Sequence, residues 1–480
     1  MIETPDNMHE DCGVAAVYGA KDAGNLCYLG LYSLQHRGQE AAGILSRDRK
    51  QFHGVKGEGL VSEVFSPKSV SRLKGDSAIG HVRYSTTGAS DDNNIQPLYS
   101  KTAKGKIAIA HNGNLTNAHK LYKSLKEKGA LFQSTVDSEV ILHLLATSKQ
   151  SEMSLALADA LSKVEGAFSL VALVDDGIIA ARDRHGFRPL VLGKRGPAYV
   201  VASETCALDL LNAKYIREIE PGELVKISAS GIESFKIPVK LSPARCVFEH
   251  VYFSRPDSIV FGENVHLVRK AFGKALAKRH KFDADMVISI PDSGNSSALG
   301  YSEESGLPLE FGMMRNHYVG RTFIQPTQSI RNLRVKVKLN PIRAVLEGKR
   351  VVVIDDSIVR GTTSKQRVSA IRNAGAKEVH MLIASPPITH PCHFGIDTPN
   401  AEQLIASSKS IEEIREYISA DSLAYLSKED MLEAIQSIPS NEFCTACFDG
   451  KYPIKVPKKR SKFVFERSNK IHLWKAGSNA

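Results

Sequence analysis

The sequence predicts two domains of different fold class: an α+β layered sandwich, followed by an α/β domain built on a parallel sheet. The chain has 480 residues, which is enough for two to four domains with ample cores. Up to about residue 236, short strand patterns come in blocks and the helical patterns are grouped apart. From about residue 242, strands alternate with helices. Pro238 and Pro243 place the boundary within residues 235–244.

Each element follows from the apolar periodicity of its segment. In the first half we predict strands over residues 13–18, 107–110, 169–174 and 224–228, and helices over residues 118–128, 138–147 and 153–162. In the second half we predict strands over residues 286–290, 351–354 and 378–384, and helices over residues 365–374, 411–419 and 428–435. Residues 351–354 are all apolar and β-branched, as expected of a strand buried in a parallel sheet.

Composition and charge exclude several classes of protein. No apolar run approaches the roughly 18 residues of a transmembrane helix. Residues 1–11 are acidic and lack the apolar core of a signal peptide, so we expect a cytoplasmic protein. The formal net charge is +11, and residues 458–480 contribute +6, from seven Lys or Arg and one Glu. Such a basic tail can bind nucleic acid, but its interleaved aromatic residues could pack onto the body, so no nucleic-acid partner is expected.

Two carboxylates and a hydroxyl-rich loop follow the strand at 351–354. Asp355 and Asp356 lie at its carboxyl end, where parallel sheets bind ligands. The loop Gly361-Thr-Thr-Ser364 opens the next helix, and its N–H groups suit a phosphate. The carboxylates suit ribose hydroxyls or a Mg²⁺ ion carried by a diphosphate. Phosphoribosyl pyrophosphate combines these groups, and the run resembles the signature of phosphoribosyltransferases. A strand–turn–helix with two solvated acids is the simpler alternative.

Two further segments of the second half fit such a ligand. Residues 290–297 place small and hydroxyl side chains after a strand, where they could approach a diphosphate closely, although an ordinary strand-to-helix turn would look the same. Residues 316–350 form a long basic segment between two strands. It could close over a polyanion and exclude water, or it could be a solvated charged face.

Cys12 lies close to the start of the chain, directly before a predicted strand. If residues 1–11 were removed, Cys12 would carry a free α-amine. The reference pKa of an α-amine is about 7.7–8.0, which suits a base for the neighbouring thiol. A single cysteine is more often a buried apolar residue.

Five short motifs in this half resemble the glutamine amidotransferase domain of the N-terminal-nucleophile type. They are Gln35-His-Arg-Gly-Gln39, His81-Val-Arg-Tyr-Ser-Thr-Thr-Gly88, Gln96-Pro97, His111-Asn-Gly-Asn114 and Ser134-Thr-Val-Asp-Ser-Glu139. The resemblance implies a Cys12 nucleophile, with Arg83 on the glutamine carboxylate and Asp137 on its ammonium group. Asn112 and the Gly113 N–H would form an oxyanion hole. A hairpin turn at residues 111–114 is the alternative, because Asn-Gly is a strong turn signal, and the two interpretations are compatible.

Both halves together resemble the amidophosphoribosyltransferase family, from His9 to about Pro453. This implies a propeptide of residues 1–11 cut before Cys12, a four-layer glutaminase sandwich over residues 12–240, a phosphoribosyltransferase domain over residues 241–457, and a basic tail over residues 458–480. Ser293, Asp355 and Asp356 would contact Mg²⁺, and both aspartates would also meet the ribose. The 5-phosphate would be held by Arg360, Gly361, Thr362, Thr363 and Ser364.

The resemblance also implies a reaction and partners. Cys12 would form a thioester with glutamine, and the released ammonia would cross to the second site and displace pyrophosphate. The products would be 5-phosphoribosylamine, glutamate and pyrophosphate, at the opening of purine synthesis. Purine nucleotides would act as feedback inhibitors, and we expect a homotetramer or a homodimer.

Four cysteines have the placement of metal ligands. Cys444 and Cys447 form a C-x-x-C pair, and Cys246 and Cys392 stand apart in the sequence. Their spacing leaves zinc, an iron–sulfur cluster or a redox pair open. One branch of the family carries a [4Fe–4S] cluster on cysteines at matching positions, together with a propeptide, so the resemblance implies this cluster. Cys27 and Cys206 match no ligand position and are expected to be buried and inert.

Two other functions fit part of the sequence. Another amidotransferase with the same first half, such as glutamine–fructose-phosphate amidotransferase or asparagine synthetase, lacks the 351–364 motif. A regulatory protein that senses phosphoribosyl pyrophosphate without turnover has no need of Cys12, Arg83, Asn112 and Asp137. Glutamine hydrolysis separates the sensor from the enzyme.

Overall fold

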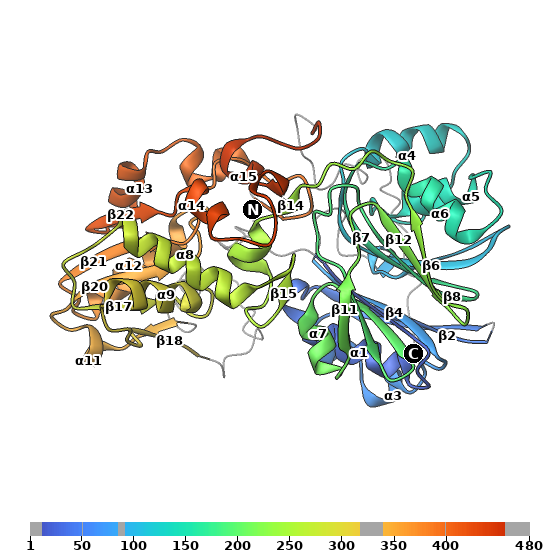
Figure 1. Ribbon diagram of the computed structural model, residues 1–480, viewed down its shortest axis with the longest axis horizontal. Coiled ribbons are helices and arrows are strands. Elements are labelled where there is room, and N and C mark those ends of the chain that lie inside the picture. The colour runs from blue at the N-terminus through green and yellow to red at the C-terminus, as the bar shows by residue number, and fades with distance from the viewer. Residues whose placement is uncertain (1–11, 50, 85–91, 317–338, 399, 457–480) are drawn as a thin grey trace, which may run out of the picture. The chain divides into compact units, whose positions relative to one another are not determined.

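The computed structural model describes residues 12–49, 51–84, 92–316, 339–398 and 400–456 (Figure 1). The contacts divide the described chain into two units, one holding residues 12–243, His393–Asp397 and residues 454–456, the other holding Ala244–Cys392 and Thr398–Pro453. The predicted division into continuous segments 12–240 and 241–457 therefore differs from the contacts, which assign His393–Asp397 to the first unit. No helix in the described ranges is long and apolar enough to span a bilayer.

The first unit contains two antiparallel sheets. The larger has the order β11 (Lys214–Glu218), β9 (Val191–Arg195), β10 (Ala198–Ala202), β1 (Gly13–Tyr18), β4 (Ser77–Arg83), β2 (Ala41–Asp48) and β3 (Gln51–Glu58). The smaller has the order β13 (Gly231–Lys236), β12 (Glu223–Ser228), β8 (Gly177–Arg182), β7 (Gly166–Val174), β6 (Gly105–Leu115) and β5 (Leu98–Thr102).

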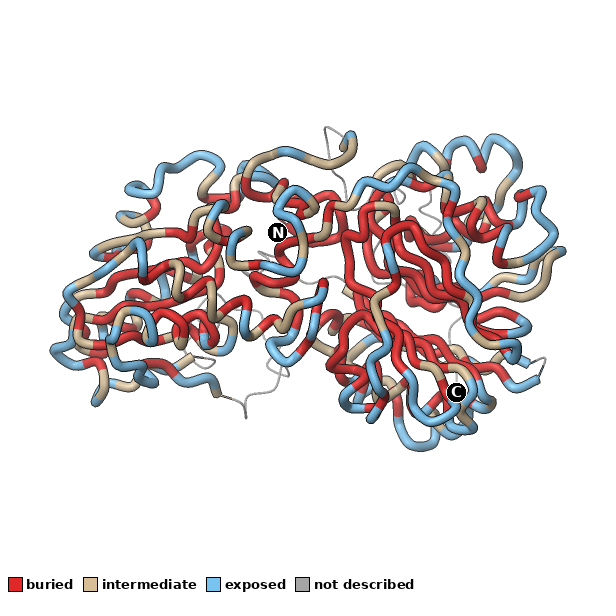
Figure 2. The backbone as a smooth tube through the Cα atoms, in the orientation of Figure 1, coloured by how far each residue is buried: buried red, intermediate tan, exposed pale blue. Residues whose placement is uncertain are grey.

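Alternation along these strands builds four layers. Val14 of β1, Ala110 of β6 and Val171 of β7 belong to one buried cluster between the sheets, and Figure 2 shows these inner strands as buried. The outer face of the larger sheet is covered by α1 (Ala23–Ser33), α2 (Val61–Val64) and α7 (Thr205–Leu210). The outer face of the smaller sheet is covered by α4 (Ala118–Glu127), α5 (Glu139–Ala146) and α6 (Met153–Ser162).

The second unit is built on a parallel sheet with the order β17 (Met286–Ser289), β20 (Arg350–Asp355), β21 (Glu378–Ile383) and β22 (Ser422–Tyr425). α9 (Asn295–Ser305) packs on β17 and β20, and α8 (Val265–Arg279) packs on α9. α12 (Thr362–Asn373) and α13 (Ile411–Ile418) complete the core with Val368 and Ile414. The shorter elements are α3 (Pro67–Val70), α11 (Arg343–Leu346), α14 (Lys428–Glu433), α15 (Ala446–Asp449), β14 (Arg245–Cys246), β15 (Ile259–Val260), β16 (Glu263–Asn264), β18 (Met313–Arg315), β19 (Leu339–Pro341) and β23 (Phe443–Cys444).

The structure differs from the sequence prediction at three places that bear on function. Residues 111–114 continue β6 in unbroken register with β7, so the hairpin-turn alternative is wrong. α12 begins at Thr362, three residues before the predicted helix, because Gly361 adopts a left-handed conformation that starts it. α1 was not predicted, since its two glycines disfavour a helix, yet packing against β1 and β4 overrides that weak preference.

Candidate functional site

Strand alternation places three of the predicted glutaminase residues between the two sheets. Val14, Ile79 and Ala110 face the layer between the sheets. Residues two or four positions away along the same strands share that face. Cys12 before β1, Arg83 at the end of β4 and Asn112 on β6 therefore all face inward. A hydrogen bond between His81 Nε2 and the His111 carbonyl oxygen, at 3.1 Å, joins the two sheets next to these residues.

The Cys12 thiol is buried and neutral at physiological pH. Cys12 is only 8% exposed, and its Sγ donates to the Tyr84 carbonyl oxygen at 3.5 Å. Burial raises the pKa of Cys12 to about 11, while the charge of Arg83 opposes this shift and those of Glu40 and Asp137 add to it. Because the thiolate is the nucleophile, this thiol needs a base to remove its proton.

Asn112 is the least satisfied polar side chain of this site. It is fully buried, and neither its amide nitrogen nor its amide oxygen has a hydrogen-bond partner within the described residues. Buried amides are almost always paired, so an orphaned one marks a place where a ligand belongs. Its neighbour Gly113 has a φ of +140°, and a Cβ there would lie 2.1 Å from the Ala167 carbonyl oxygen. Only glycine fits this strand position.

Asp137 is held against the end of β6. Its Oδ2 accepts from the Leu115 N–H at 2.8 Å, and its Oδ1 lies 3.9 Å from His111 Nδ1. Ser138 Oγ lies 2.9 Å from the same His111 nitrogen. Cys12, Arg83, Asn112, Gly113 and Asp137 thus come together at one end of the inter-sheet layer, since Arg83 and Asp137 also act on the Cys12 thiol.

Other residues of the quoted motifs hold this arrangement, and their roles were not predicted. Gln96 Oε1 accepts from the His111 N–H at 2.8 Å, so the Gln96-Pro97 motif positions β6. Arg37 forms a buried ion pair with Glu204. No sequence signal links Arg37 to Glu204, which lies far along the chain.

The second predicted site lies at the carboxyl edge of the parallel sheet. Ser289 of β17 pairs with Ile354 of β20, so the loop after β17 and the pair Asp355–Asp356 leave the sheet side by side. The loop approaches closely: a Cβ on Gly294 would lie 2.4 Å from the Ile354 carbonyl oxygen. Ser293 is half-buried in this loop. The structure therefore brings Ser293 to the same sheet edge as both aspartates.

Asp355 is engaged within the protein. It is fully buried, its Oδ1 accepts from the Asp356 N–H at 3.0 Å, and its Oδ2 pairs with Arg367 at 2.5 Å. Burial raises the pKa of Asp355 to about 7, Arg367 opposes that shift, and the charge of Asp356 adds to it. Asp356 accepts from the Ser357 hydroxyl.

The predicted phosphate-binding residues form the first turn of α12. Gly361 has a φ of +79° and no side chain caps the helix, so its first N–H groups can serve a ligand. Thr362 is exposed, Thr363 is half-buried and Ser364 is buried. The Arg360 guanidinium donates to Gln403 Oε1 at 3.3 Å.

The four cysteines predicted as metal ligands converge in the second unit. Cys246 of β14 is the register partner of Cys444 of β23. The Cys447 carbonyl oxygen accepts from Thr389 and His390, which brings the segment before Cys392 against it. All four are buried, and the charges of the other three raise the pKa of Cys447 beyond the effect of burial. Cys27 and Cys206 are buried, as expected.

In the part of the chain that the structure describes, no three His, Cys, Asp or Glu side chains are arranged to hold a metal ion. This applies to the four cysteines and to Asp355 and Asp356. The predicted propeptide, the basic tail and most of the predicted lid, residues 317–338, lie outside the described residues.

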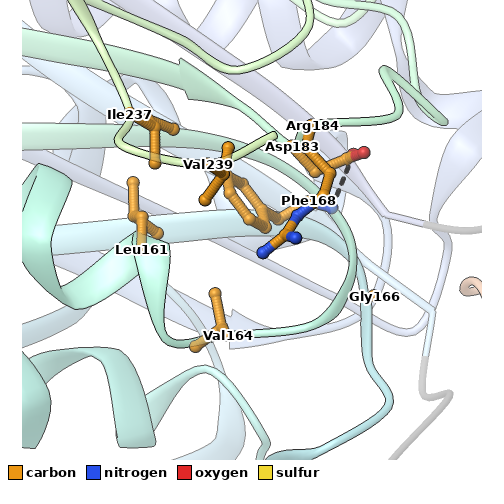
Figure 3. Close-up of a pocket in the computed structure, with 8 residues that line it drawn as sticks. All are labelled: Leu161, Val164, Gly166, Phe168, Asp183, Arg184, Ile237 and Val239. Atoms are coloured by element: carbon orange, nitrogen blue, oxygen red, sulfur yellow. Dashed lines mark hydrogen bonds between the residues drawn. The ribbon is translucent and has the colours of Figure 1, made fainter. Parts of the chain in front are cut away.

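The described cavities do not coincide with the predicted sites. A small cavity of about 10 Å³ lies beside Phe168 and Asp183 (Figure 3), which is room for about one water molecule. A larger one of about 350 Å³ lies along β2, β3 and β5 and includes Glu139. Neither is lined by a residue predicted to bind substrate.

Comparison with known proteins identifies the family. The model of a glutamine amidotransferase domain matches residues 81–210. The chain is 51% identical over 455 residues to amidophosphoribosyltransferase 1, chloroplastic, of Arabidopsis thaliana, covering 94% of this chain and 80% of the relative.

Two solved structures match it along most of their length, each with a TM-score of 0.89 and 47% identity. One is described as the allosteric regulatory enzyme of purine biosynthesis. The match covers 93% of this chain and 97% of the chain of that structure. The other is glutamine phosphoribosylpyrophosphate amidotransferase from B. subtilis complexed with ADP and GMP, covering 94% of this chain and 99% of its own. These likenesses confirm the predicted pair of fold classes, and the chain belongs to the amidophosphoribosyltransferase family.

Proposed function

We propose that this protein converts glutamine, phosphoribosyl pyrophosphate and water to 5-phosphoribosylamine, glutamate and pyrophosphate. Family membership supports the overall reaction. The observation that carries the assignment to residues is the orphaned Asn112 amide, buried at the inner end of β6 on the face that Cys12 and Arg83 share. A sensor without turnover has no use for a buried unpaired donor beside a thiol.

Glutamine hydrolysis begins at Cys12. The sulfur attacks the side-chain carbonyl carbon of glutamine, and the thiol proton passes to a base. The Asn112 amide and the Gly113 N–H stabilise the negative oxygen. The nitrogen then takes that proton from the base, the carbon–nitrogen bond breaks, ammonia leaves, and water hydrolyses the thioester to glutamate. Removal of residues 1–11 would supply the α-amine of Cys12 as the base.

Arg83 and Asp137 hold the amino-acid end of glutamine in this proposal. A guanidinium pairs with a carboxylate through two parallel hydrogen bonds, and a carboxylate pairs with an ammonium group. Asp137 already anchors the Leu115 N–H, so ammonium binding and the geometry of β6 are linked. The first half of the reaction is therefore confined to the first unit.

Phosphoribosylamine forms at the edge of the parallel sheet. The ammonia nitrogen attacks C1 of the ribose, and the bond to pyrophosphate breaks. Arg360 and Gly361, which precede α12, and its first turn from Thr362 to Ser364 hold the 5-phosphate, and Asp355 and Asp356 meet the ribose. With Ser293 these aspartates would also hold Mg²⁺, which when bound neutralises the diphosphate. Each oxygen of Asp355 already has one partner in the protein, and its remaining lone pairs can meet the ligand beside Arg367.

A [4Fe–4S] cluster is our proposal for Cys246, Cys392, Cys444 and Cys447. The four thiols are buried and electrostatically coupled, which suits a set of thiolate ligands. Four thiolates also suit a tetrahedral zinc ion. The resemblance to the cluster-carrying branch of the family favours the cluster. Iron and acid-labile sulfide in anaerobic protein, and their loss in Cys447→Ser, would test this.

Regulation, assembly and location follow as proposals. The solved B. subtilis relative is complexed with ADP and GMP, which supports purine nucleotides as inhibitors of this chain. A homotetramer or homodimer remains our prediction for the assembly. A cytoplasmic location also remains our prediction.

Glutamate release tests the function directly. Glutamine is supplied anaerobically with Mg²⁺, with and without phosphoribosyl pyrophosphate, and glutamate and pyrophosphate are measured together. Strong stimulation by the donor, with both products formed in step, is the expected result. Hydrolysis that is unaffected by phosphoribosyl pyrophosphate would overturn the proposed transfer of ammonia to it. No hydrolysis at all would favour a regulatory protein that senses phosphoribosyl pyrophosphate without turnover.

A further inference from the structure

One short segment of the second half of the sequence belongs to the first unit. Residues His393–Asp397 contact that unit, while Cys392 and Thr398 on either side of it belong to the second unit. The ends of the segment are held together, because the Cys392 N–H donates to Thr398 Oγ1 at 2.7 Å. The segment is thus a closed loop whose tip packs among the strands of the proposed glutaminase.

The tip is fixed to β6 and to the loop after β8. Asn114 Nδ2 donates to the His393 carbonyl oxygen at 2.9 Å. The Arg188 guanidinium donates to the Phe394 carbonyl oxygen at 3.4 Å. The Phe394 ring stacks on Phe187 with centroids 4.2 Å apart and planes inclined by 17°. Arg188, Phe187 and Phe394 are all buried, so these contacts are shielded from water.

These anchors surround the part of β6 that the glutamine site uses. Asn114 lies between Gly113 and Leu115, whose N–H is bound by Asp137. Asn114 also shares the inward face with Asn112, because the register with β7 is unbroken. On the neighbouring strand, Ser169 pairs with Asn112, and its hydroxyl donates to the Arg188 carbonyl oxygen at 3.0 Å.

The loop after β8 that receives the tip is itself rigid. Asp183 accepts from the Phe168 N–H at 3.0 Å, the bond drawn in Figure 3, and from the His185 N–H at 2.8 Å. This fixes the start of the stretch that carries Phe187 and Arg188. The tip is therefore clamped between a fixed loop and the end of β6.

We propose that His393–Asp397 is a positioning segment for glutamine hydrolysis. It holds the end of β6 so that the Asn112 amide, the Gly113 N–H and Asp137 keep the spacing that glutamine needs. The first half of the chain then requires a piece of the second half to complete its site. The inference rests on the proposed glutaminase, and Asn114, Arg188 and Phe394 act through β6 and not on the substrate.

Phe394→Ala and Asn114→Ala test the segment in the full-length, anaerobically isolated protein. Small misplacements of binding groups cost up to about a hundredfold in rate, so we expect kcat/KM for glutamine to fall about ten- to a hundredfold, with a raised KM. Synthesis of phosphoribosylamine from ammonia, which bypasses glutamine, should change less than about twofold, because displacement of pyrophosphate is placed at the sheet edge of the second unit.

Phe65→Ala is the matched control. Phe65 is as buried as Phe394 (3% against 4% exposed) and also contacts an aromatic ring, that of Tyr28, but on the outer face of the larger sheet. It should lower the melting temperature without raising the KM for glutamine. The proposal is overturned if Phe394→Ala affects glutamine use no more than Phe65→Ala, or if glutamine- and ammonia-dependent synthesis fall equally. Failure of the proposed function is distinct, because the unsubstituted protein would then release no glutamate.

Discussion

The two proposed sites differ in how their polar groups are satisfied. In the first unit, Asn112 is fully buried and its side-chain amide is unpaired. In the second, Asp355 is equally buried, but both its oxygens are bound by the protein, one of them by Arg367. The unpaired Asn112 amide destabilises the folded state until a ligand pairs with it, whereas Asp355 is already stabilised by protein partners that a ligand would share.

This difference teaches what substitutions should do to stability. An unpaired buried polar group costs roughly 1–3 kcal/mol, so an apolar replacement of Asn112 relieves the folded state. Removing one member of a buried ion pair leaves the other uncompensated, which costs about 3–5 kcal/mol. Substitution of Asn112 should therefore lower activity without lowering stability, whereas substitution of Asp355 should lower both.

Among variants that keep the Cys12 nucleophile, Asn112→Leu should have the largest effect on the rate of glutamine hydrolysis. Loss of one oxyanion donor typically lowers kcat about 10²- to 10³-fold, and we expect this for glutamine hydrolysis, with an unchanged or higher melting temperature. Glutamate release and a thermal melt of the same preparation check both parts. A variant that hydrolyses glutamine normally would remove Asn112 from the proposed oxyanion hole.

Asp355→Leu should have the largest effect on stability. The Arg367 charge would remain partly buried without its partner, so we expect the free energy of unfolding to fall by about 3–5 kcal/mol. Asp285→Asn is the matched control, because Asp285 pairs with Arg350 at 3.1 Å in a position that is partly open to solvent. That pair should contribute less than about 1 kcal/mol. Equal losses in urea unfolding would contradict the contrast.

Gly361→Ala should weaken the binding of phosphoribosyl pyrophosphate without affecting the binding of glutamine. The φ of +79° is strained for alanine, and its Cβ would lie 2.7 Å from Ile405 Cδ1. The first turn of α12 would shift, and we expect KM for phosphoribosyl pyrophosphate to rise about tenfold, or roughly 1.4 kcal/mol. Ammonia-dependent synthesis at varied donor concentration measures this, and an unaltered KM would argue against a phosphate at this turn.

A change of pH should have the smallest of these effects on glutamine hydrolysis. The raised pKa of Cys12, about 11, keeps its thiol protonated throughout the range pH 6 to 9. The rate should then follow the base: it rises with pH as the α-amine loses its proton and levels off above roughly 7.7–8.0. A rate at saturating donor that still climbs tenfold per unit at pH 9 would mean that direct ionisation of the thiol controls the reaction.

Sequence patterns predicted the fold classes and part of the secondary structure, because periodicity reports which face of a strand or helix is buried; strands such as β2 and β8 were not predicted. The helix at Met153–Ser162 and the strand at Gly13–Tyr18 have the predicted bounds. Residues 111–114 look like a turn because Asn-Gly usually makes one, and only the pairing of β6 with β7 shows that Gly113 serves a strand. Contacts between distant residues, such as Arg367 with Asp355 or Phe394 with Phe187, leave no periodic signal.

Replacing Cys12 by alanine tests most directly the claim that the first unit hydrolyses glutamine and the second unit displaces pyrophosphate. The variant is given phosphoribosyl pyrophosphate and Mg²⁺ with either glutamine or ammonia, and pyrophosphate release is measured. The account predicts no release from glutamine above background, a loss of at least about 10³-fold, with release from ammonia retained within about twofold. Loss of both activities, or retention of the glutamine reaction, would contradict it.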